Sequence, residues 1–351
     1  MLTYNQYSLK SFHTLAINNI SARKIIVARN ITQLLKIWNF CKKNKHPFLI
    51  LGEGSNTVFL ENYQGVIVLN RIKGIYISQN KNYWFLHVQS GEKWHKLVQY
   101  TLKTGLFGLE NLAFIPGYLG SAIIQNIGAF GVEIKDVCQY VDVLFFKHLK
   151  ITRIYLESCS FQYRSSIFKK RLKKDFAIIS IGLQLKKKWN PIISYGPLKK
   201  IHPDNTSPRK IFNIIYQLRK KKIPDPKILG NAGSFFINPI ISTHIFNNLK
   251  KNYLHIPHIY HNQNTVKISA SWLIKKSGLN KYSIGGASVY NKNPLILVNQ
   301  NNATAKDIIY LAKKICLTIK LKFNILIKPE VQIIAKQGHK NFFRIIGIDN
   351  N

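Results

Sequence analysis

Glycines at positions 117, 120, 128 and 131 interrupt the segment from Glu110 to Gly131, which is otherwise rich in small and apolar residues. Glycine weakens the interior of helices and strands, so we expect a long loop. Ordering such a loop costs conformational entropy that little packing offsets, which favours a ligand cradle over a purely structural loop. The groups able to surround a pyrophosphate belong to Gly117, Gly120, Ser121, Asn126 and Gly128.

A second glycine-containing segment, LILGEGSNTVFL, runs from Leu49 to Leu60. A strand that leads into Gly52-Glu53-Gly54 lets backbone N–H groups approach a phosphate. A Rossmann fingerprint would add a third glycine and a helix directly afterwards, but the chain continues as a turn and a strand. That dinucleotide-binding helix is therefore excluded, and a tight hairpin turn explains the segment as well as a cofactor loop does.

Composition and length place the chain among folded globular proteins. It has 351 residues, of which 46% are hydrophobic and 12% aromatic, too much apolar surface for a disordered chain. At roughly 150 residues per domain we expect two or three domains. Every apolar stretch ends before the ~18 residues that a membrane-spanning helix needs, and the N-terminus lacks the pattern of a secretory signal.

The four cysteines lie far apart without C-x-x-C spacing, which argues against a disulfide scaffold or structural zinc and suits a reducing cytoplasm. His255, His258 and His261 have a spacing that invites a metal hypothesis. Pro257 would break any helix that aligned them, and no nearby cysteine or acidic residue supports it. We expect a solvated loop and no metal.

The formal net charge of +38 is typical of nucleic-acid-binding proteins. The lysines, however, are spread along the chain rather than concentrated on one segment, and Ile and Asn are abundant as in a composition drifting with an AT-rich genome. We therefore expect no specific nucleic-acid partner, although some affinity for polyanions follows from charge alone.

Hydrophobic periodicity predicts an α+β protein. The expected strands are KIIVA, PFLILG, GVIVLN, YWFLHVQSG, VDVLFF, FAIISIGLQL and PLILVN, with ILIKPEVQII closing the chain. The expected helices are TQLLKIWNFCKKN, Trp94 to Thr104, PRKIFNIIYQLRKKK, SWLIKKSG and TAKDIIYLAKKICLTI.

Five motifs in order carry a family resemblance: ILGEGSN, IPGxxGSxxxQNIGAxG, YRSSIFK, PDPKxxGNAGSFFxNP and PEV. Together they resemble the UDP-N-acetylenolpyruvoylglucosamine reductases (UDP-N-acetylmuramate dehydrogenases), FAD- and NADPH-dependent enzymes of peptidoglycan precursor synthesis. The match extends from Leu9 to Ile334. The Tyr195-Gly196 pair and the segment from about Ile240 to Lys267 resemble the extra Tyr loop and insertion of the longer family type.

The resemblance implies an α+β fold with a two-lobed FAD-binding unit of the vanillyl-alcohol-oxidase (PCMH) type and a following α+β substrate-binding domain. It divides the chain into FAD-binding lobes at 1–74 and 75–190, a connecting segment with the Tyr loop at 191–225, a substrate-binding domain at 226–325, and a strand and tail at 326–351 that return to the flavin.

FAD is expected to bind without a covalent link, because no His or Cys lies in the cofactor loops. A covalent flavin oxidase on the same fold is thereby disfavoured. NADPH is expected as co-substrate, and the protein as a cytoplasmic monomer with no membrane partner. The residues implied for FAD are Gly52, Glu53, Gly54, Ser55, Asn56, Pro116, Gly117, Gly120, Ser121, Gln125, Asn126 and Gly128.

The same resemblance assigns three catalytic residues. Hydride from flavin N5 to the vinyl carbon of UDP-N-acetylglucosamine enolpyruvate leaves negative charge that Arg164 would bind through the carboxylate. Ser234 would donate the proton, and Glu330 would stabilise the intermediate, giving the lactyl ether of UDP-N-acetylmuramate. Each residue alone has a simpler structural explanation, but their joint motif placement reverses that preference. The residues implied for substrate binding are Tyr163, Tyr195, Arg219, Lys222 and Asn238.

Some positions depart from the family pattern without touching the three catalytic residues. They are Ile123 at a usual Pro, Phe130 at a usual Tyr, Gln332 at a usual Arg, Asn293 at a usually longer polar residue, and Leu15 at a usual Phe. We expect an enzyme that has drifted and lost some stability and polar contacts, but is active.

Overall fold

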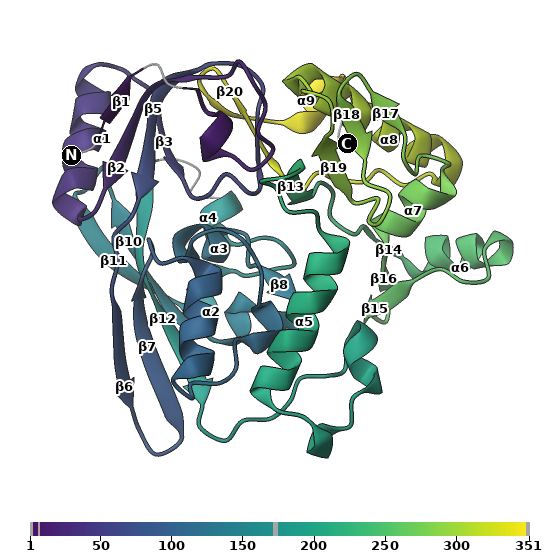
Figure 1. The fold of residues 1–351 in the computed structure, drawn as a ribbon, viewed down its shortest axis with the longest axis horizontal. Helices are drawn as coiled ribbons and strands as arrows, with labels where there is room; N and C mark the ends of the chain where they lie inside the picture. The colour runs from purple at the N-terminus through teal and green to yellow at the C-terminus, as the bar shows by residue number, and fades with distance from the viewer. Residues whose placement is uncertain (1–2, 6–7, 171–174, 349–351) are drawn as a thin grey trace. The chain divides into compact units, whose positions relative to one another are not determined.

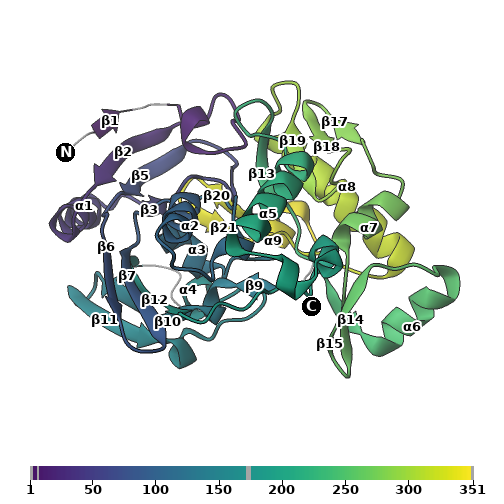
Figure 2. The same ribbon diagram turned by 60° about the horizontal axis from the view of Figure 1, so that its bottom comes forward.

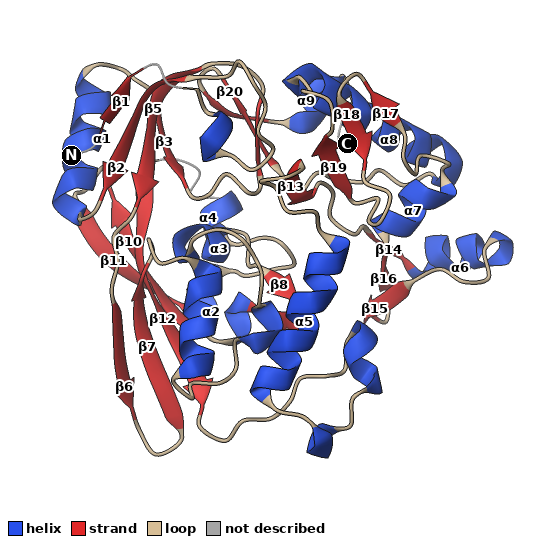
Figure 3. Ribbon diagram, in the orientation of Figure 1, coloured by secondary structure: helices blue, strands red, loops and turns tan. Residues whose placement is uncertain are grey.

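The computed structural model describes residues 3–5, 8–170 and 175–348. The chain forms two compact units. Unit 1 comprises Met1–Asn5, Lys24–Glu53 and Gly65–Lys221, and unit 2 comprises Gln6–Arg23, Gly54–Gln64 and Lys222–Asn351. Both contain helices and strands, so the α+β expectation is confirmed (Figure 3). The five consecutive segments expected from the sequence remain a prediction, and the last residues of the expected tail lie outside the described part.

Unit 1 contains a four-stranded sheet in the order β1-β2-β5-β3, in which β3 runs parallel to β5. Helix α1 (Ile31–Lys43) lies beside this sheet (Figure 1). It begins where the Asn30 side chain accepts a hydrogen bond from the Gln33 N–H, and it buries residues at helical spacing against the sheet. The strands are β1 (Thr3–Asn5), β2 (Ala22–Ala28), β3 (Phe48–Leu51) and β5 (Tyr63–Asn70).

A second sheet of unit 1 is antiparallel, in the order β11-β10-β12-β7-β6. Its strands are β6 (Ile75–Gln79), β7 (Tyr83–Gln89), β10 (Cys138–Phe145), β11 (Lys150–Tyr155) and β12 (Phe176–Lys186). Helices α2 (Trp94–Lys103), α3 (Leu119–Ile124) and α5 (Pro208–Lys222) share one apolar core with it. The remaining elements are α4 (Ile167–Lys170) and the small hairpin of β8 (Gly128–Ala129) and β9 (Val132–Glu133).

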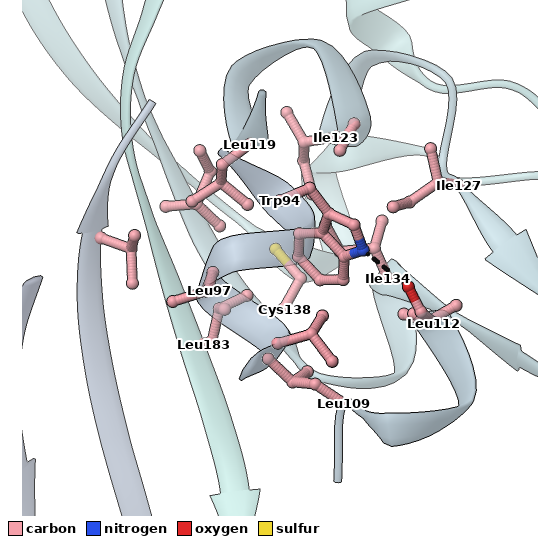
Figure 4. Packing of buried hydrophobic residues seen from close by; sticks show 14 of the residues in the cluster. Trp94, Leu97, Leu109, Leu112, Leu119, Ile123, Ile127, Ile134, Cys138 and Leu183 are labelled. Carbon is pink, nitrogen blue, oxygen red and sulfur yellow. Dashed lines mark hydrogen bonds between the residues drawn. The ribbon is translucent and has the colours of Figure 1, made fainter. Parts of the chain in front are cut away.

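Trp94 fills the centre of this core (Figure 4). Its ring is completely buried, and its indole N–H donates a 2.9 Å hydrogen bond to the Leu112 carbonyl. The polar atom of a buried indole thus has a partner, as it needs. The bond also fixes the start of the glycine-rich segment against α2.

Unit 2 contains an antiparallel sheet in the order β13-β19-β18-β17, with the long helix α8 (Ala305–Phe323) alongside it (Figure 2). Its strands are β13 (Gly230–Ser234), β17 (Ser283–Ile284), β18 (Ala287–Val289) and β19 (Ile296–Asn299). Helices α7 (Ala270–Lys276) and α9 (Phe342–Ile346) also contact α8.

Two further sheets complete unit 2. One has the order β14-β16-β15, built from β14 (Ile240–Ser242), β15 (His258–Asn262) and β16 (Thr265–Ile268), with helix α6 (Thr243–Asn252) beside it. The other has the order β21-β20-β4, built from β4 (Thr57–Phe59), β20 (Gln332–Ala335) and β21 (Gly338–Lys340). Strand β20 runs parallel to β4, with Ile333 opposite Val58.

Three local expectations need correction. The segment after Gly52 is not a hairpin, because β3 pairs with β5 whereas β4 pairs with β20. The glycine-rich segment is not loop throughout, since it contains α3 and β8. His258 and His261 lie on the exposed strand β15 rather than in a loop, because the strand is held by pairing with β16.

Within the described ranges, no helix is long and apolar enough to cross a membrane. The same residues contain no group of three or more His, Cys, Asp or Glu placed to hold a metal ion.

Candidate active site

The two glycine-containing segments meet within unit 1. The Gly117 N–H donates a 2.7 Å hydrogen bond to the Glu53 carboxylate, which also forms a 2.9 Å ion pair with Lys93. A Cβ atom on Gly52 would lie 2.9 Å from the Ser121 hydroxyl oxygen, so glycine is required for this approach. The parts of the two predicted cofactor segments that belong to unit 1 are therefore in contact.

Exposure divides the expected cofactor residues into two groups. Gly54, Gly117 and Asn126 are buried and order the loops. The others keep part of their surface accessible, which fits residues that contact a bound cofactor: Gly52, Glu53, Ser55, Asn56, Pro116, Gly120, Ser121, Gln125 and Gly128. Within unit 1, the close-packed backbone at Gly52 and Gly120, beside Ser121, fits a phosphate of FAD.

Asn126 is fully buried and all of its side-chain contacts lie within unit 1. Its amide N–H groups donate to the Glu133 carboxylate at 2.8 Å and to the Gln162 carbonyl at 3.1 Å. Its amide oxygen accepts from the Lys135 N–H at 3.2 Å. Asn126 therefore ties the glycine-rich segment to the turn that carries Arg164.

Arg164 lies in a tight turn with an unusual backbone. The N–H groups of Gln162 and Ser165 each donate to the other's carbonyl, at 2.9 and 3.0 Å, and close the turn around Tyr163 and Arg164. The φ of Arg164 is +54°, a conformation that costs a non-glycine residue free energy. Its Nη2 donates a 2.8 Å hydrogen bond to the Gly128 carbonyl, which aims the guanidinium at the cofactor segment.

Two expected substrate residues also belong to unit 1. Tyr195 is 39% exposed, and its ring lies 6.5 Å from the Phe130 ring at nearly a right angle. Arg219, on α5, donates from Nε to the Phe114 carbonyl at 3.1 Å. Both side chains therefore border the glycine-rich segment rather than lying apart from it.

Ser234 and Glu330 are brought together in unit 2. The Glu330 N–H donates a 2.8 Å hydrogen bond to the Phe235 carbonyl. The neighbouring residues Phe236 and Pro329 pair as an isolated antiparallel β-bridge. A register shift between Asn231 and Ser234 in β13 marks a bulge, a feature that redirects side chains next to active sites. The serine and the glutamate thus lie on neighbouring backbone segments.

Asn56 connects this pair to the end of the turn from Gly52 to Asn56, which is called the cofactor turn below. Its amide donates to the Glu330 carbonyl at 3.2 Å, and its own carbonyl accepts from the Gln332 N–H at 2.9 Å. Asn56, β20 and Glu330 are consequently held together within unit 2.

The remaining expected substrate residues of unit 2 are less concentrated. The Asn238 side-chain oxygen accepts from the Ala270 N–H at 2.9 Å, so part of its amide is used to fix the start of α7. Lys222 is exposed at the end of α5. The structure thus adds no short-range contact that joins either residue to Ser234.

The departures from the family pattern have local explanations. Ile123 and Leu15 are fully buried in apolar cores, and the Asn293 side-chain oxygen accepts a hydrogen bond from the Leu295 N–H within its own turn. Gln332 uses its backbone N–H to bond Asn56. None of these contacts replaces or disturbs the turn around Arg164 or the Ser234–Glu330 pair.

His13 is a functional-site neighbour that the sequence did not single out. It is 3% exposed, and a Cβ on Gly54 would lie 2.5 Å from its Cα. Burial lowers its pKa to about 4, which the nearby Ile17 backbone offsets only in part. It lies in an irregular segment, where no periodicity could reveal a residue packed beneath the cofactor turn.

Arg71 is a second residue near the candidate site that the sequence did not single out. Its guanidinium lies 3.9 Å from the centre of the Tyr118 ring, inside the cofactor segment. Burial lowers its pKa, while Tyr118 and Glu53 oppose that shift. The interaction joins residues far apart in sequence, and only the packing of the two glycine segments brings them together.

Comparisons with known proteins agree with this arrangement. Residues 22–147 match the model of the FAD binding domain, and residues 225–334 match that of the UDP-N-acetylenolpyruvoylglucosamine reductase C-terminal domain. The reductase of that name from Buchnera aphidicola subsp. Acyrthosiphon pisum is 52% identical over 335 residues, which cover 95% of this chain and 94% of the relative. That from Escherichia coli is 43% identical over 332 residues, covering 95% and 97%.

A solved structure shares the fold. The crystal structure of UDP-N-acetylenolpyruvylglucosamine reductase from Thermus caldophilus has a TM-score of 0.63 at 20% identity, covering 95% of this chain and 99% of that one. The full-length sequence similarity, with both domain models, shows more than the fold. The chain belongs to the UDP-N-acetylenolpyruvoylglucosamine reductase family and is an FAD-dependent oxidoreductase of peptidoglycan synthesis.

Proposed function

We propose that the protein uses NADPH to reduce the enolpyruvyl ether of UDP-N-acetylglucosamine enolpyruvate to a lactyl ether, giving UDP-N-acetylmuramate. The observation that carries this proposal is the arrangement in unit 2. A serine at a strand bulge and a glutamate lie on hydrogen-bonded backbone segments, and Asn56 ties the glutamate to the end of the cofactor turn. A proton donor and an acid are thus paired beside a flavin-binding element.

The accessible residues of the glycine segments would hold FAD, through Gly52, Ser55, Gly120, Ser121 and Gly128. When bound and reduced, FAD supplies hydride chemistry. Glu53 keeps its carboxylate engaged with Gly117 and Lys93, so its role is to hold the two segments together. Gly54, Gly117 and Asn126 contribute by shaping the loops.

Arg164 binds the substrate carboxylate in this proposal. Its guanidinium is planar and carries several N–H donors in a fixed fork, a geometry that matches a carboxylate. One nitrogen is already fixed by the Gly128 carbonyl, which lowers the entropy lost when the group binds an anion. Positive charge at this position also stabilises the negative charge that develops next to the carboxylate.

Ser234 donates the proton to the substituted carbon, and Glu330 supports the charge that precedes the transfer. A serine hydroxyl is a weak acid, so its transfer needs a fixed position and stabilised negative charge. The bulge in β13 supplies the first. Glu330 supplies the second in this proposal, from the segment whose backbone bonds the Phe235 carbonyl.

The UDP portion is assigned to Tyr163, Tyr195, Arg219, Lys222 and Asn238. Arginine and lysine suit a diphosphate, and the exposed Tyr195 is accessible to a substrate. We also infer a cytoplasmic monomer. All four cysteines, which lie in the described part of the chain, are buried and unpaired, as in a reducing compartment.

Steady-state turnover tests the proposal. Purified protein should release FAD on acid precipitation and sustain NADPH oxidation over many turnovers only when UDP-N-acetylglucosamine enolpyruvate is present. NADH at the same concentration is the control for the nicotinamide. Flavin that stays on the precipitated protein, or NADPH oxidation that depends on oxygen rather than on the enolpyruvyl substrate, would instead indicate an oxidase.

A further inference from the structure

We propose that His95 is a positioning residue for UDP-sugar binding: it fixes the Phe114 peptide, and that peptide fixes Arg219. The inference rests on the proposed function, because it takes Arg219 as a ligand of the substrate. All three residues lie within unit 1. His95 lies on α2, Arg219 lies on α5, and Phe114 is two residues before Pro116 of the cofactor segment.

The first link is a hydrogen bond that only a neutral imidazole can accept. The Phe114 N–H donates to Nδ1 of His95 at 3.0 Å. Nδ1 therefore carries no proton, and the ring proton of the neutral form lies on Nε2. Phe114 has a φ of +58°, which is unfavourable for a bulky residue, so the bond to His95 holds a strained backbone in place.

The second hydrogen bond involves the carbonyl group of the same residue, Phe114. The Phe114 carbonyl accepts the Arg219 Nε–H at 3.1 Å. Nε lies at the base of the guanidinium, so this bond sets the direction of the group. A rotation of the Phe114 backbone would consequently move both Arg219 and the start of the glycine-rich segment.

Aromatic packing fixes the imidazole plane. The His95 ring stacks on Phe212 at 5.9 Å with an interplanar angle of 7°, and on Tyr216 at 6.0 Å and 21°. The Phe114 ring meets it edge-on at 5.7 Å and 90°. With its plane held from α5, the ring presents Nδ1 to the Phe114 N–H in one orientation.

Charge favours the neutral form. Burial lowers the pKa of His95, and the positive charge of Arg219 lowers it further. The titratable groups that face the ring are Arg219 and Tyr216, both on α5. Protonation of the ring at acidic pH would turn Nδ1 into a donor, oppose the Phe114 N–H and repel Arg219, so UDP-sugar binding should weaken on acidification.

Two replacements separate the hydrogen bond from the packing. His95→Asn places an amide oxygen near the Nδ1 position and removes the stacked ring. His95→Phe keeps a stacked ring and removes the acceptor. Lys96→Gln is the matched control, because Lys96 is the next residue on α2 and is exposed. The probe is UDP-N-acetylglucosamine, whose diphosphate diester keeps a constant charge between pH 5 and 8.

Calorimetric titration of each FAD-loaded protein at pH 8 gives the dissociation constant. We expect His95→Phe to raise it about tenfold, on the scale of losing one hydrogen bond, and His95→Asn to stay within about threefold of the parent. Lys96→Gln should match the parent. Equal binding by His95→Phe and the parent would overturn the inference, as would a loss in His95→Asn as large as that in His95→Phe.

The pH dependence of the parent provides a test that needs no variant to fold. Its dissociation constant should stay constant at pH 6.5 and above, and should rise at lower pH, where His95, whose pKa lies below the ordinary 6.5, becomes protonated, while FAD content stays unchanged. A flat profile would overturn the inference and leave the proposed function intact. Failure of the parent to bind the UDP-sugar at pH 8 would instead overturn the proposed function.

Discussion

Arg164 has a positive φ, and its guanidinium is held by the Gly128 carbonyl. The position of this side chain therefore depends on the backbone at Gly128. A Cβ on Gly128 would lie 3.2 Å from Nη1 of Arg164 and 2.9 Å from Cγ of Glu133. The missing side chain at Gly128 therefore leaves room for the Arg164 guanidinium in its observed orientation.

Replacing Arg164 with Lys should lower turnover by more than an order of magnitude, because lysine keeps the charge but loses the planar fork. Gly128→Ala should lower it in the same direction by displacing the guanidinium. Stopped-flow flavin reduction by NADPH should be nearly unchanged in Arg164→Lys. An equal loss in both half-reactions would mean that Arg164 serves the cofactor or the fold.

Replacements of Ser234 separate proton donation from flavin reduction and from binding of the UDP-sugar. Ser234→Ala removes one oxygen and no charge, so flavin reduction by NADPH and binding of the UDP-sugar should survive. Reoxidation of reduced flavin by the enolpyruvyl substrate should slow by ~10² or more. Ser234→Cys restores a transferable proton and should be substantially faster than Ala. Parental reoxidation in Ser234→Ala would show that Ser234 is only a turn residue.

His13 makes stability depend on pH. Its folded pKa of about 4 lies below its ordinary 6.5, so the unfolded chain binds the proton first as the pH falls. Stability is complete above pH 6.5 and is lost progressively between 6.5 and 4, by about 3 kcal/mol for this 97% buried group.

His13→Leu should remove that part of the slope when unfolding by urea is followed at several pH values. At pH 8 both proteins carry a neutral residue here, and their difference measures packing alone. The same loss of stability on acidification in the variant and the parent would show that His13 does not titrate as its burial requires.

At the scale of elements, strand β20 supports the cofactor turn through β4. The two strands run parallel, with Ile333 opposite Val58, and β4 begins directly after Asn56. Ile333 is 2% exposed, so its truncation leaves a cavity in the core. The strand pair is thus a point where packing and cofactor binding are connected.

Ile333→Ala should destabilise the protein by about 2–5 kcal/mol, as for large-to-small changes in other cores. It should also lose FAD more readily during gel filtration, because the turn is less firmly held. Lys340→Ala, on the exposed part of β21, is the control and should change neither property. Parental FAD retention in a measurably destabilised Ile333→Ala would separate the strand pair from the cofactor turn.

Elements with strong periodicity were predictable, and those defined by distant partners were not. Helix α1 buries Leu34, Ile37, Trp38 and Cys41 at the spacing of one helix face, and the sequence shows it. Strand β6 is largely exposed and exists because it pairs with β7. Helix α6 buries only Phe246 among its residues, so packing against a core does little to define it.

The site shows the same division. Motifs predict Arg164, Ser234 and Glu330 as catalytic residues, but they give no account of what holds these residues in place. The Gly128 carbonyl, the bulge in β13 and the Phe235 carbonyl supply that support, and each depends on contacts between distant segments. No role for His13 or His95 could be predicted for the same reason, since the contacts that bear on it are with Gly54 and Phe114.

For the whole molecule, the charge of +38 and the fold point to different functions, and the fold decides between them. A sequence-tolerant nucleic-acid protein combines a basic groove with stacking aromatics. Here aromatic residues such as Phe212 and Tyr216 stack within the structure on His95. Full-length similarity to UDP-N-acetylenolpyruvoylglucosamine reductases identifies the family without reference to the charge.

The division of the chain into units also differs from a simple linear order. Residues Gln6–Arg23 and Gly54–Gln64 belong to the same unit as the C-terminal segment. Hydrogen bonds explain this, because Thr14 accepts the Asn231 N–H and Asn56 bonds Glu330. Early segments thus complete the unit that carries Ser234 and Glu330.

An anaerobic titration tests the central claim most directly. NADPH added without oxygen should bleach the 450 nm absorption of the bound FAD, and one equivalent of UDP-N-acetylglucosamine enolpyruvate should then restore it. Mass spectrometry should find a UDP-sugar heavier by two hydrogens, as UDP-N-acetylmuramate requires. If the flavin stays reduced until oxygen is admitted, or the UDP-sugar keeps its mass, the account of this protein as a reductase of the enolpyruvyl ether is contradicted.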